Sequence, residues 1–321
     1  MRILVLGGTS FVGRFIVAEA LHQGHDLTLF HRGRTGTDLF PEAERLRGDR
    51  DAADLTALKE GSWDAVVDVS AFVPRHVRQA AEILAERVGR YLFISTNAVY
   101  APGAGPGADE SAPLKDPEWH TEVIDEDTYG PLKVACENEV TSRYGDRATI
   151  VRPGVLIGPH DTGDQFTYWV RRAAQGGKVV LPGDPGQPVQ VLDARDLARL
   201  VVRLLEEGHE GVFNAMGPPQ PLTLAELIHT CAEAAESHIE LVLVPPETVM
   251  AKFPLVRADR TWEQSFQRDF ARAREVGLPS TPLLTTAADV LAWDRKRGEP
   301  PLKQAPHPEV ERNLLAYVQG R

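Results

Sequence analysis

Short apolar runs alternate with amphipathic stretches along the first half of the chain. Turn residues bound five apolar runs, at 3–6, 27–30, 65–69, 91–94 and 149–151. Strands that alternate with helices in this way predict a parallel sheet covered by helices. We therefore expect an α/β fold with a doubly wound parallel sheet of the Rossmann type. The apolar stripes expected to face its core are Phe11, Phe15, Ala18 and Leu21 in one helix and Val77, Ala80, Ala81 and Leu84 in another.

The regular alternation ends after Arg152. Glycine and proline breaks follow, with helical stretches expected near 165–175, 194–207 and 222–236. We interpret this part as a smaller substrate domain that is partly interleaved with the dinucleotide-binding domain. The dinucleotide-binding domain would comprise 1–153 and about 188–215, and the substrate domain about 154–187 and 216–321. An irregular stretch at 101–128 exceeds the ~12 to 15 residues of ordinary connections and is typical of a lid or substrate wall.

Composition excludes several classes of protein. The 321 residues are 42% hydrophobic and carry a net charge of -11, which suits a soluble globular protein and repels nucleic acid and anionic lipid. No apolar run approaches the ~20 residues of a membrane helix, and no cationic leader precedes one. Cys136 and Cys231 lack the spacing of a zinc site, so we expect two buried thiols and no metal. We expect a cytoplasmic protein.

A glycine-rich turn joins the first strand to the first helix. In the dinucleotide fingerprint G-x-G-x-x-G, three glycines allow a tight turn, the approach of a pyrophosphate and the packing of helix on strand. Gly8 and Gly13 fit this pattern, whereas Ser10 takes the second place. Either the turn no longer holds a dinucleotide, or the Ser10 hydroxyl caps the helix and donates to a phosphate. The expected pyrophosphate-binding residues are Gly7, Gly8, Thr9, Ser10, Phe11, Val12 and Gly13.

The second strand ends where this fingerprint places a carboxylate for the ribose of NAD. The sequence there reads "LFHRGR", with His31, Arg32 and Arg34 instead of an acid. A guanidinium matches a 2'-phosphate in charge and geometry, so NADP is favoured over NAD, although a solvated basic turn is the alternative. Asp49 could accept from an adenine amino group. Ser70 and Ala71, two small residues after a strand, would let the cofactor pass over the sheet edge.

Three residues form a candidate chemical group. Tyr129 and Lys133 of "YGPLK" are four residues apart on one expected helix, so both side chains share a face. A nearby cation favours the phenolate form of a tyrosine, whose pKa is otherwise near 10. Thr96 follows the strand at 91–94, at the edge where open parallel sheets bind ligands, and its hydroxyl could bond a substrate oxygen. A turn or capping role is the alternative for Thr96.

The motifs "GGTSFVG", "STNAVY", "YGPLK" and "RPGVLIGPHD" together resemble the extended branch of the short-chain dehydrogenase/reductase superfamily, which contains NAD-dependent epimerases and dehydratases. The resemblance implies that Tyr129 is the acid/base, Lys133 its activator and ribose anchor, and Thr96 the hydroxyl partner of the substrate. It also implies an NAD(P) cofactor and a homodimer. Cofactor contacts are further implied for Ser95, Pro153, Gly154 and Val155.

The loop with Ser10 and the segment "GPHDTGDQFTYWVRR" also resemble an atypical subgroup that includes chloroplast stem-loop-binding proteins. Those relatives are associated with RNA and tend to lack the tyrosine and lysine that this chain keeps. We therefore favour an NAD(P)-dependent epimerase, dehydratase or reductase that acts on a hydroxylated carbonyl compound, such as a sugar or nucleotide sugar. The alternatives are a non-catalytic NADP-binding regulator and an RNA-binding relative.

One motif departs from the nucleotide-sugar enzymes of this branch. In "VQVLDARDLA", Val189 stands where those enzymes carry an arginine that holds the nucleotide. The possible substitutes are Arg171, Arg172 and Arg195, and the possible pocket residues are His120, Tyr168 and Trp169. Each of these six residues could instead be a surface charge or part of the core. The identity of the substrate is left open.

Overall fold

The structure, a computed structural model, describes residues 1–245, 249, 251–257 and 266–319. The chain forms two compact units. The first contains Met1–Gly154, Ala194–Met216 and Arg268–Pro279, and the second contains Val155–Asp193, Gly217–Gln267 and Ser280–Arg321. Compared with the division expected from the sequence, 188–193 lies in the second unit and 268–279 in the first.

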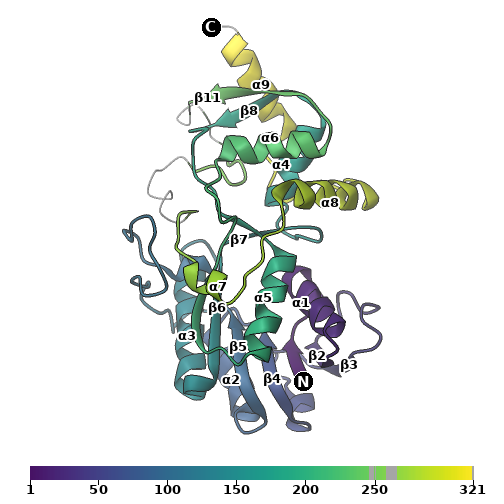
Figure 1. Cartoon of the computed structure of the whole chain (residues 1–321), viewed down its shortest axis with the longest axis vertical. Helices are drawn as coiled ribbons and strands as arrows, with labels where there is room; N and C mark the ends of the chain where they lie inside the picture. Colours follow the sequence, from purple (N-terminus) through teal and green to yellow (C-terminus); the bar gives the residue numbers. More distant parts are fainter. Residues whose placement is uncertain (246–248, 250, 258–265, 320–321) are drawn as a thin grey trace. The chain divides into compact units, whose positions relative to one another are not determined.

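A seven-stranded parallel sheet forms the centre of the first unit (Figure 1). The strand order is β10-β6-β5-β4-β1-β2-β3, so the connections reverse direction between β4 and β1. Open α/β sheets bind ligands at the carboxyl ends of strands at such a switch point. The strands are β1 (Arg2–Leu6), β2 (Asp26–His31), β3 (Glu44–Arg47), β4 (Trp63–Asp68), β5 (Val88–Ile94), β6 (Ala148–Pro153) and β10 (Gly211–Ala215).

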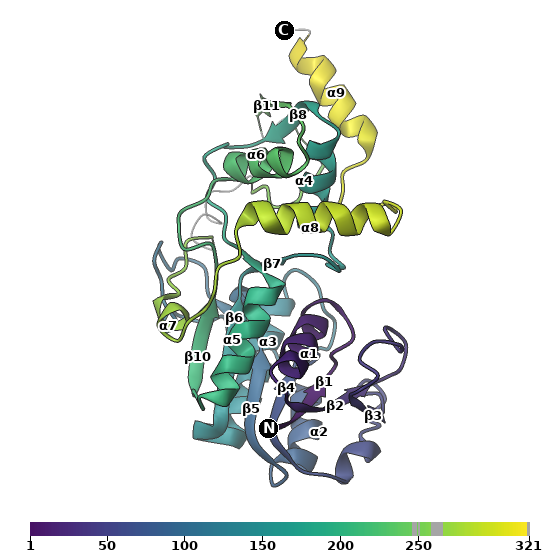
Figure 2. The same cartoon turned by 45° about the vertical axis from the view of Figure 1, so that its right-hand side comes forward.

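Helices cover both faces of this sheet, which confirms the predicted Rossmann fold. Helix α1 (Phe11–His22) packs beside α5 (Ala194–Glu206), and α2 (Pro74–Leu84) packs beside α3 (Tyr129–Tyr144). Figure 2 shows the first pair in front of the sheet and the second pair behind it. The short helix α7 (Ala271–Glu275) contacts β10. The stripe expected on α2 is fully buried, at Val77, Ala80, Ala81 and Leu84.

The stripe expected on α1 was wrong. The residues of α1 that are buried are Gly13, Ile16, Val17 and Ala20. Ala18 of the expected stripe is exposed instead. The reason is the glycine turn: Gly13 must face Gly8 for the turn to close, and this contact fixes the rotation of the helix. The buried face therefore continues from Gly13 at helical spacing.

The second unit has a core of its own, in which Phe166 and Trp169 are among the largest fully buried side chains. Helix α4 packs against α6 and α8, and α9 packs against a two-stranded parallel sheet of β8 and β11. A second two-stranded sheet pairs β7 with β9. These elements are α4 (Gln165–Ala174), α6 (Leu224–Ala234), α8 (Leu283–Lys296), α9 (Pro308–Gln319), β7 (Val155–Ile157), β8 (Gly177–Pro182), β9 (Val191–Asp193) and β11 (Ile239–Val244).

Most of the expected elements lie where the sequence placed them. The helices expected near 165–175, 194–207 and 222–236 are α4, α5 and α6, whereas the edge strand β10 was missed. Both cysteines are buried free thiols, as predicted. Among the described residues, no helix combines the length and apolar character that crossing a membrane requires.

Candidate active site

The glycine turn leaves β1 at the switch point of the sheet. Gly7 and Gly8 have φ angles of 110° and 96°, which favour glycine. A Cβ atom on Gly7 would lie 2.6 Å from Val69 Cγ2, and one on Gly13 would lie 2.8 Å from Gly8 Cα. The turn therefore needs bare backbone at these places. It leads directly into the N-terminus of α1, whose unpaired N–H groups suit an anion.

Ser10 stands at the N-cap position of α1 and is exposed. Its backbone is extended, with φ -130° and ψ 145°, and its hydroxyl makes no capping hydrogen bond. Capping therefore does not explain the serine. The tight contact in this turn is between Gly8 and Gly13. The Ser10 side chain is exposed to solvent, so it does not interfere with that contact. Thr9 and Phe11 beside it are half-buried.

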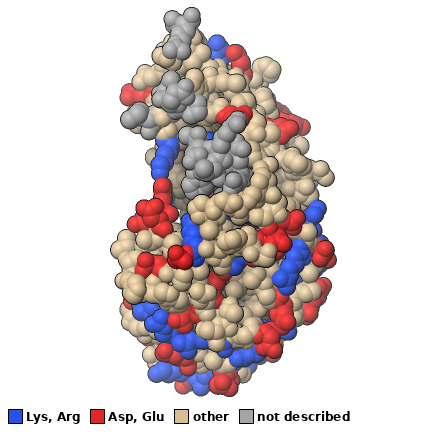
Figure 3. Space-filling view, turned by 90° about the vertical axis from the view of Figure 1, so that its left-hand side faces the viewer, with Lys and Arg blue, Asp and Glu red and all other residues tan. Residues whose placement is uncertain are grey.

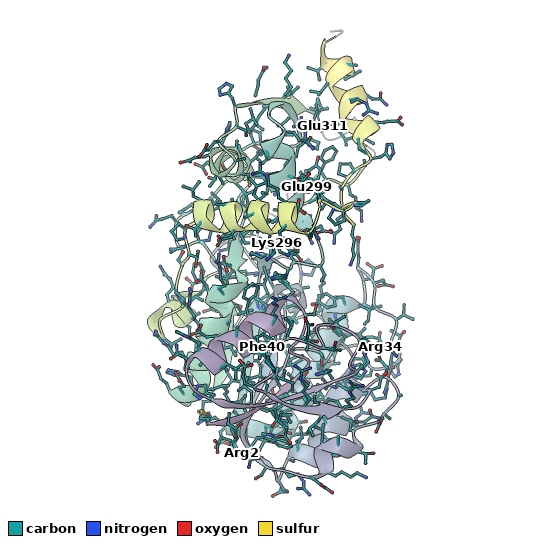
Figure 4. All side chains as sticks on the ribbon, turned by 90° about the vertical axis from the view of Figure 1, so that its right-hand side faces the viewer. Arg2, Arg34, Phe40, Lys296, Glu299 and Glu311 are labelled. Atoms are coloured by element: carbon teal, nitrogen blue, oxygen red, sulfur yellow. The ribbon has the colours of Figure 1, made fainter. Side chains whose placement is uncertain are left out.

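The loop after β2 carries the basic residues expected near the adenosine ribose. The Arg32 side chain is 47% exposed and lies 3.0 Å from Asp51, and the Arg34 side chain is 70% exposed and lies 3.7 Å from Asp49. Figure 4 shows Arg34 on the outside of the first unit. This loop contacts the glycine turn, because the hydroxyls of Thr9 and Thr35 are 3.2 Å apart. Two exposed guanidinium groups therefore lie on a loop that touches the turn.

His31 and Asp49 are more constrained than the two arginines. His31 is buried, its Nδ1 accepts from the Gly33 N–H at 2.9 Å, and burial lowers the pKa of its imidazole. The backbone of Asp49 pairs with Asp54, and its carboxylate accepts from the Asp51 N–H at 3.1 Å. His31 therefore faces the protein interior, whereas the Asp49 carboxylate keeps partial access to solvent.

Tyr129 and Thr96 meet at the carboxyl edge of the sheet. Tyr129 is the first residue of α3, and Thr96 follows the last residue of β5 by two positions. Burial raises the pKa of the Tyr129 phenol, and a hydrogen bond from Thr96 opposes that rise. The Thr96 hydroxyl oxygen also accepts from the Ala98 N–H at 3.2 Å. The structure therefore brings together two of the three residues of the candidate chemical group through their hydroxyls.

Lys133 lies one turn further along α3 and is buried. Its ammonium donates to the carbonyl oxygens of Ala71 at 2.9 Å and Ile94 at 2.7 Å, and its nitrogen lies 4.0 Å from the centre of the Phe93 ring. Burial lowers the pKa of Lys133 to about 8. The described partners of this cation are thus the backbone carbonyls of the last residue of β5 and of a residue in the loop after β4. The lowering of the Tyr129 pKa that we expected from Lys133 is not found, because burial raises the pKa of this phenol.

Three expected cofactor residues are engaged inside the protein. The Ser70 hydroxyl donates to Leu6 O at 3.0 Å, Ala71 is buried, and the Ser95 hydroxyl donates to the Glu137 carboxylate. Glu137 also holds Arg152 through two hydrogen bonds, of 3.0 and 2.6 Å. Glu137 lies two helical turns beyond Tyr129 on α3 and Arg152 lies on β6, and sequence reasoning missed this buried pair.

Sequence reasoning also missed a buried carboxylate, Asp68, at the end of β4. Its partners are Arg50, at 2.7 and 2.8 Å, and the Tyr91 hydroxyl, at 2.6 Å. Although burial opposes it, the charge of Arg50 holds the pKa of Asp68 below its usual value. The available signal was an acidic residue that directly follows a run of apolar strand residues in "DAVVDVSA".

The remaining candidates follow β6 or lie in the second unit. Pro153 ends β6, Gly154 N–H donates to Ala215 O at 3.1 Å, and Val155 begins β7. Arg171 binds Asp294 and Arg172 binds Glu311, so both serve the second unit internally. Buried positions in this unit are Tyr168, Trp169 and Val189, whereas His120 of the first unit is exposed.

Comparisons with known proteins show the family and agree with the fold. The family model described as "NAD dependent epimerase/dehydratase family" matches residues 3–215. The chain is 25% identical over 253 residues to the chloroplast stem-loop binding protein of 41 kDa b of Arabidopsis thaliana, a match that covers 73% of this chain and 63% of the plant protein. The chain thus spans less than two thirds of that relative.

Two further similarities concern epimerases. The chain is 24% identical over 307 residues to UDP-glucose 4-epimerase of Corynebacterium glutamicum, with 82% of this chain and 90% of that protein covered. The crystal structure of UDP-glucuronic acid 4-epimerase from Bacillus cereus in complex with NAD has a TM-score of 0.70 at 16% identity, and covers 92% of this chain and 99% of that one. At this identity the structural likeness supports the fold alone.

Proposed function

The chain belongs to the NAD-dependent epimerase/dehydratase family, and from this premise we propose that it is an enzyme that transfers a hydride between NAD(P) and a hydroxylated carbonyl compound. The observation that carries the proposal is that the Tyr129 phenol and the Thr96 hydroxyl meet at the carboxyl edge of the sheet, where Tyr129 begins α3 and Thr96 follows β5. This pair lies on the same edge as the glycine turn. A proton-transfer group and a cofactor-binding turn on one edge are what such a reaction requires.

Tyr129 is the proposed acid/base. Its hydroxyl can transfer a proton to or from a substrate oxygen, and Thr96 can orient that oxygen by a second hydrogen bond. Burial keeps Tyr129 protonated at neutral pH, so the phenol is poised to donate a proton when a carbonyl is reduced. When bound, the nicotinamide supplies or accepts the hydride.

Lys133 is the proposed anchor of the cofactor. An ammonium has three N–H donors, and the carbonyls of Ala71 and Ile94 take two of them. The third donor suits a ribose hydroxyl. Because Ile94 ends β5 and Ala71 lies in the loop after β4, the cation is held by backbone at the edge of the sheet.

NADP is the proposed cofactor. The bare backbone of the glycine turn fits a pyrophosphate, and the exposed Ser10 hydroxyl can donate to a phosphate oxygen. Arg32 and Arg34 on the adjoining loop suit a 2'-phosphate, because guanidinium groups bind phosphate by paired hydrogen bonds. His31 contributes through the position of its loop, since its ring nitrogens are buried.

Catalysis is favoured over the two alternatives. A regulator that only senses NADP has no use for a hydroxyl pair at the sheet edge. An RNA-binding protein needs a basic surface, and Figure 3 shows acidic and basic side chains interspersed on the face it presents. The net charge of -11 points the same way. Val189 stands where nucleotide-sugar enzymes of this branch carry an arginine, and it is a buried apolar residue. We therefore favour a free sugar or a ketone as the substrate over a nucleotide sugar.

The first test is a pair of fluorescence titrations with NADPH and NADH, followed by a screen of nucleotide sugars, free sugars and ketones for oxidation of NADPH. We expect NADPH to bind with a micromolar Kd and at least one carbonyl compound to be reduced. Absence of binding at millimolar concentration would overturn the cofactor proposal. Binding without turnover across the screen would favour the regulator.

A further inference from the structure

The Asp68 carboxylate is fully buried and accepts an unusual number of hydrogen bonds. Besides the two from Arg50 and the one from Tyr91, it accepts from the backbone N–H groups of Ser70 and Ala71, both at 3.0 Å. A buried ion pair contributes little net stability, because both charges lose their hydration. Apolar residues of similar size would stabilise the core equally well. We therefore looked for a role of this ion pair other than stability.

The two backbone amides belong to the loop that connects β4 to α2. The first part of this loop, residues 69–71, touches both elements that are proposed to bind the cofactor. Val69 packs against Gly7 of the glycine turn, and the Ser70 hydroxyl donates to the Leu6 carbonyl just before that turn. The Ala71 carbonyl accepts from Lys133. The conformation of this loop therefore sets the position of the Lys133 ammonium.

Arg50 links Asp68 and the 69–71 loop to the segment that follows Asp49. Its guanidinium also donates to the Ser70 hydroxyl at 3.1 Å and to the His76 carbonyl in α2 at 2.8 Å. Its own carbonyl accepts from Arg75 at 3.0 Å. Arg50 directly follows Asp49, so the segment expected near the adenine and the loop next to Lys133 are joined through one buried ion pair.

We propose that Arg50, Asp68 and Tyr91 are positioning residues that hold the 69–71 loop in the conformation in which the Ala71 carbonyl fixes Lys133. The carboxylate oxygen of Asp68 is the essential atom, because it accepts both loop amides. Arg50 balances the charge of that carboxylate, a role that a neutral amide at position 68 does not need, and Tyr91 orients the side chain. The inference rests on the proposed function only in assigning Lys133 to the cofactor site.

The experiment compares two double variants that both remove the ion pair. Arg50→Met/Asp68→Asn keeps a side-chain oxygen for the Ser70 and Ala71 amides, whereas Arg50→Met/Asp68→Leu has a similar volume without that oxygen. Lys133 accessibility is measured by reductive methylation with formaldehyde and a borane, with mass spectrometry of the peptide that contains Lys133. This readout requires neither cofactor nor substrate.

We expect Lys133 to be methylated at least tenfold faster in Arg50→Met/Asp68→Leu than in Arg50→Met/Asp68→Asn, which should stay within threefold of the wild type. Amide exchange at Ser70 and Ala71 should accelerate in parallel. Equal methylation of the two variants would overturn the proposal and leave the ion pair a purely structural feature. NADPH titration of the wild type reports separately on the proposed function.

If Arg50→Met/Asp68→Leu does not fold, a milder substitution still tests the proposal. Tyr91→Phe removes one hydrogen bond to Asp68 and retains the ring that packs against Tyr144. We expect methylation of Lys133 to accelerate two- to fivefold in this variant, with a circular dichroism spectrum like that of the wild type. An unchanged methylation rate would contradict the role of Tyr91 and with it the proposed cluster.

Discussion

Two sets of arginines lie in the first unit, in opposite environments. Arg32 and Arg34 are 47% and 70% exposed on the loop after β2, and their carboxylate partners are partly in solvent as well. Arg50 and Arg152 are buried with side-chain exposures of 8% and 4%, each facing a carboxylate that is at least as buried. The exposed pair can exchange its partners for a phosphate at small cost, because surface ion pairs contribute little.

The buried pairs cannot be exchanged in this way. Removing one member leaves a charge without water or a counterion, which costs far more than the intact pair contributes. The same residue type is thus proposed to bind a ligand in one region, whereas it organises the interior in the other. Burial, rather than position relative to a motif, distinguishes the two roles.

The largest effect is expected at Tyr129, the proposed acid/base. Tyr129→Phe keeps the ring but deletes the proton-transfer hydroxyl, so the rate of hydride transfer should fall by about 10² to 10⁴. NADPH affinity should change little, because the phenol is one contact among many. The measurement is single-turnover oxidation of NADPH with a substrate found by the screen. Retention of the rate within a factor of two would show that Tyr129 is not the acid/base.

The second effect tests the buried region directly. Arg152→Met leaves the Glu137 carboxylate buried with the Ser95 hydroxyl as its remaining described partner, so the free energy of unfolding should fall by about 3 to 5 kcal/mol. Arg152→Met/Glu137→Gln removes both charges and should recover most of that loss. Urea unfolding measures both. Arg34→Met, the surface control, should change stability by less than about 0.5 kcal/mol.

The third effect belongs to the exposed region. Arg32→Ala should weaken NADPH binding by about 1.5 to 3 kcal/mol, as for a hydrogen bond to a charged group, and leave NADH binding almost unchanged. Parallel fluorescence titrations give both dissociation constants. An equal loss for the two cofactors would show that Arg32 does not contact a 2'-phosphate. The folded protein should keep its melting temperature, because the Arg32 pair is exposed.

The smallest effect is a difference in pH dependence. Burial lowers the pKa of Lys133 to about 8 in the folded protein, below the value of 10.5 for a free lysine, so the unfolded chain binds more protons between these values. The stability of the wild type should therefore rise with pH relative to Lys133→Met, by roughly 1.5 kcal/mol between pH 8 and 9.5. Urea unfolding at several pH values measures the difference. Parallel curves would show that burial does not shift the pKa of Lys133.

The sequence was sufficient where a local pattern decides the structure. Alternating apolar runs predicted the strands and helices of the Rossmann unit, and the positive φ angles of Gly7 and Gly8 follow from the glycine motif. The family also follows from short motifs that the family model matches. These features depend on neighbours in the chain, so periodicity and residue type carry the information.

The sequence was insufficient where contacts between distant segments decide. The rotation of α1 depends on the contact of Gly13 with Gly8, and an apolar count alone selected the wrong stripe. The expectation that Lys133 would act on the phenol did not foresee the two backbone carbonyls that hold its ammonium. The rotation of α1 and the position of the Lys133 ammonium both depend on where backbone atoms of distant segments lie. The pattern of side chains along the sequence does not contain this information.

The sequence by itself therefore determined the fold, the family and the position of Tyr129 and Lys133 near the carboxyl edge of the sheet. Only the tertiary structure decided which charges are buried: Arg50 meets Asp68 across 18 residues, whereas Arg32 stays in solvent. The physical reason is that the cost of a charge depends on its hydration, and hydration is a property of the packed chain rather than of the residue.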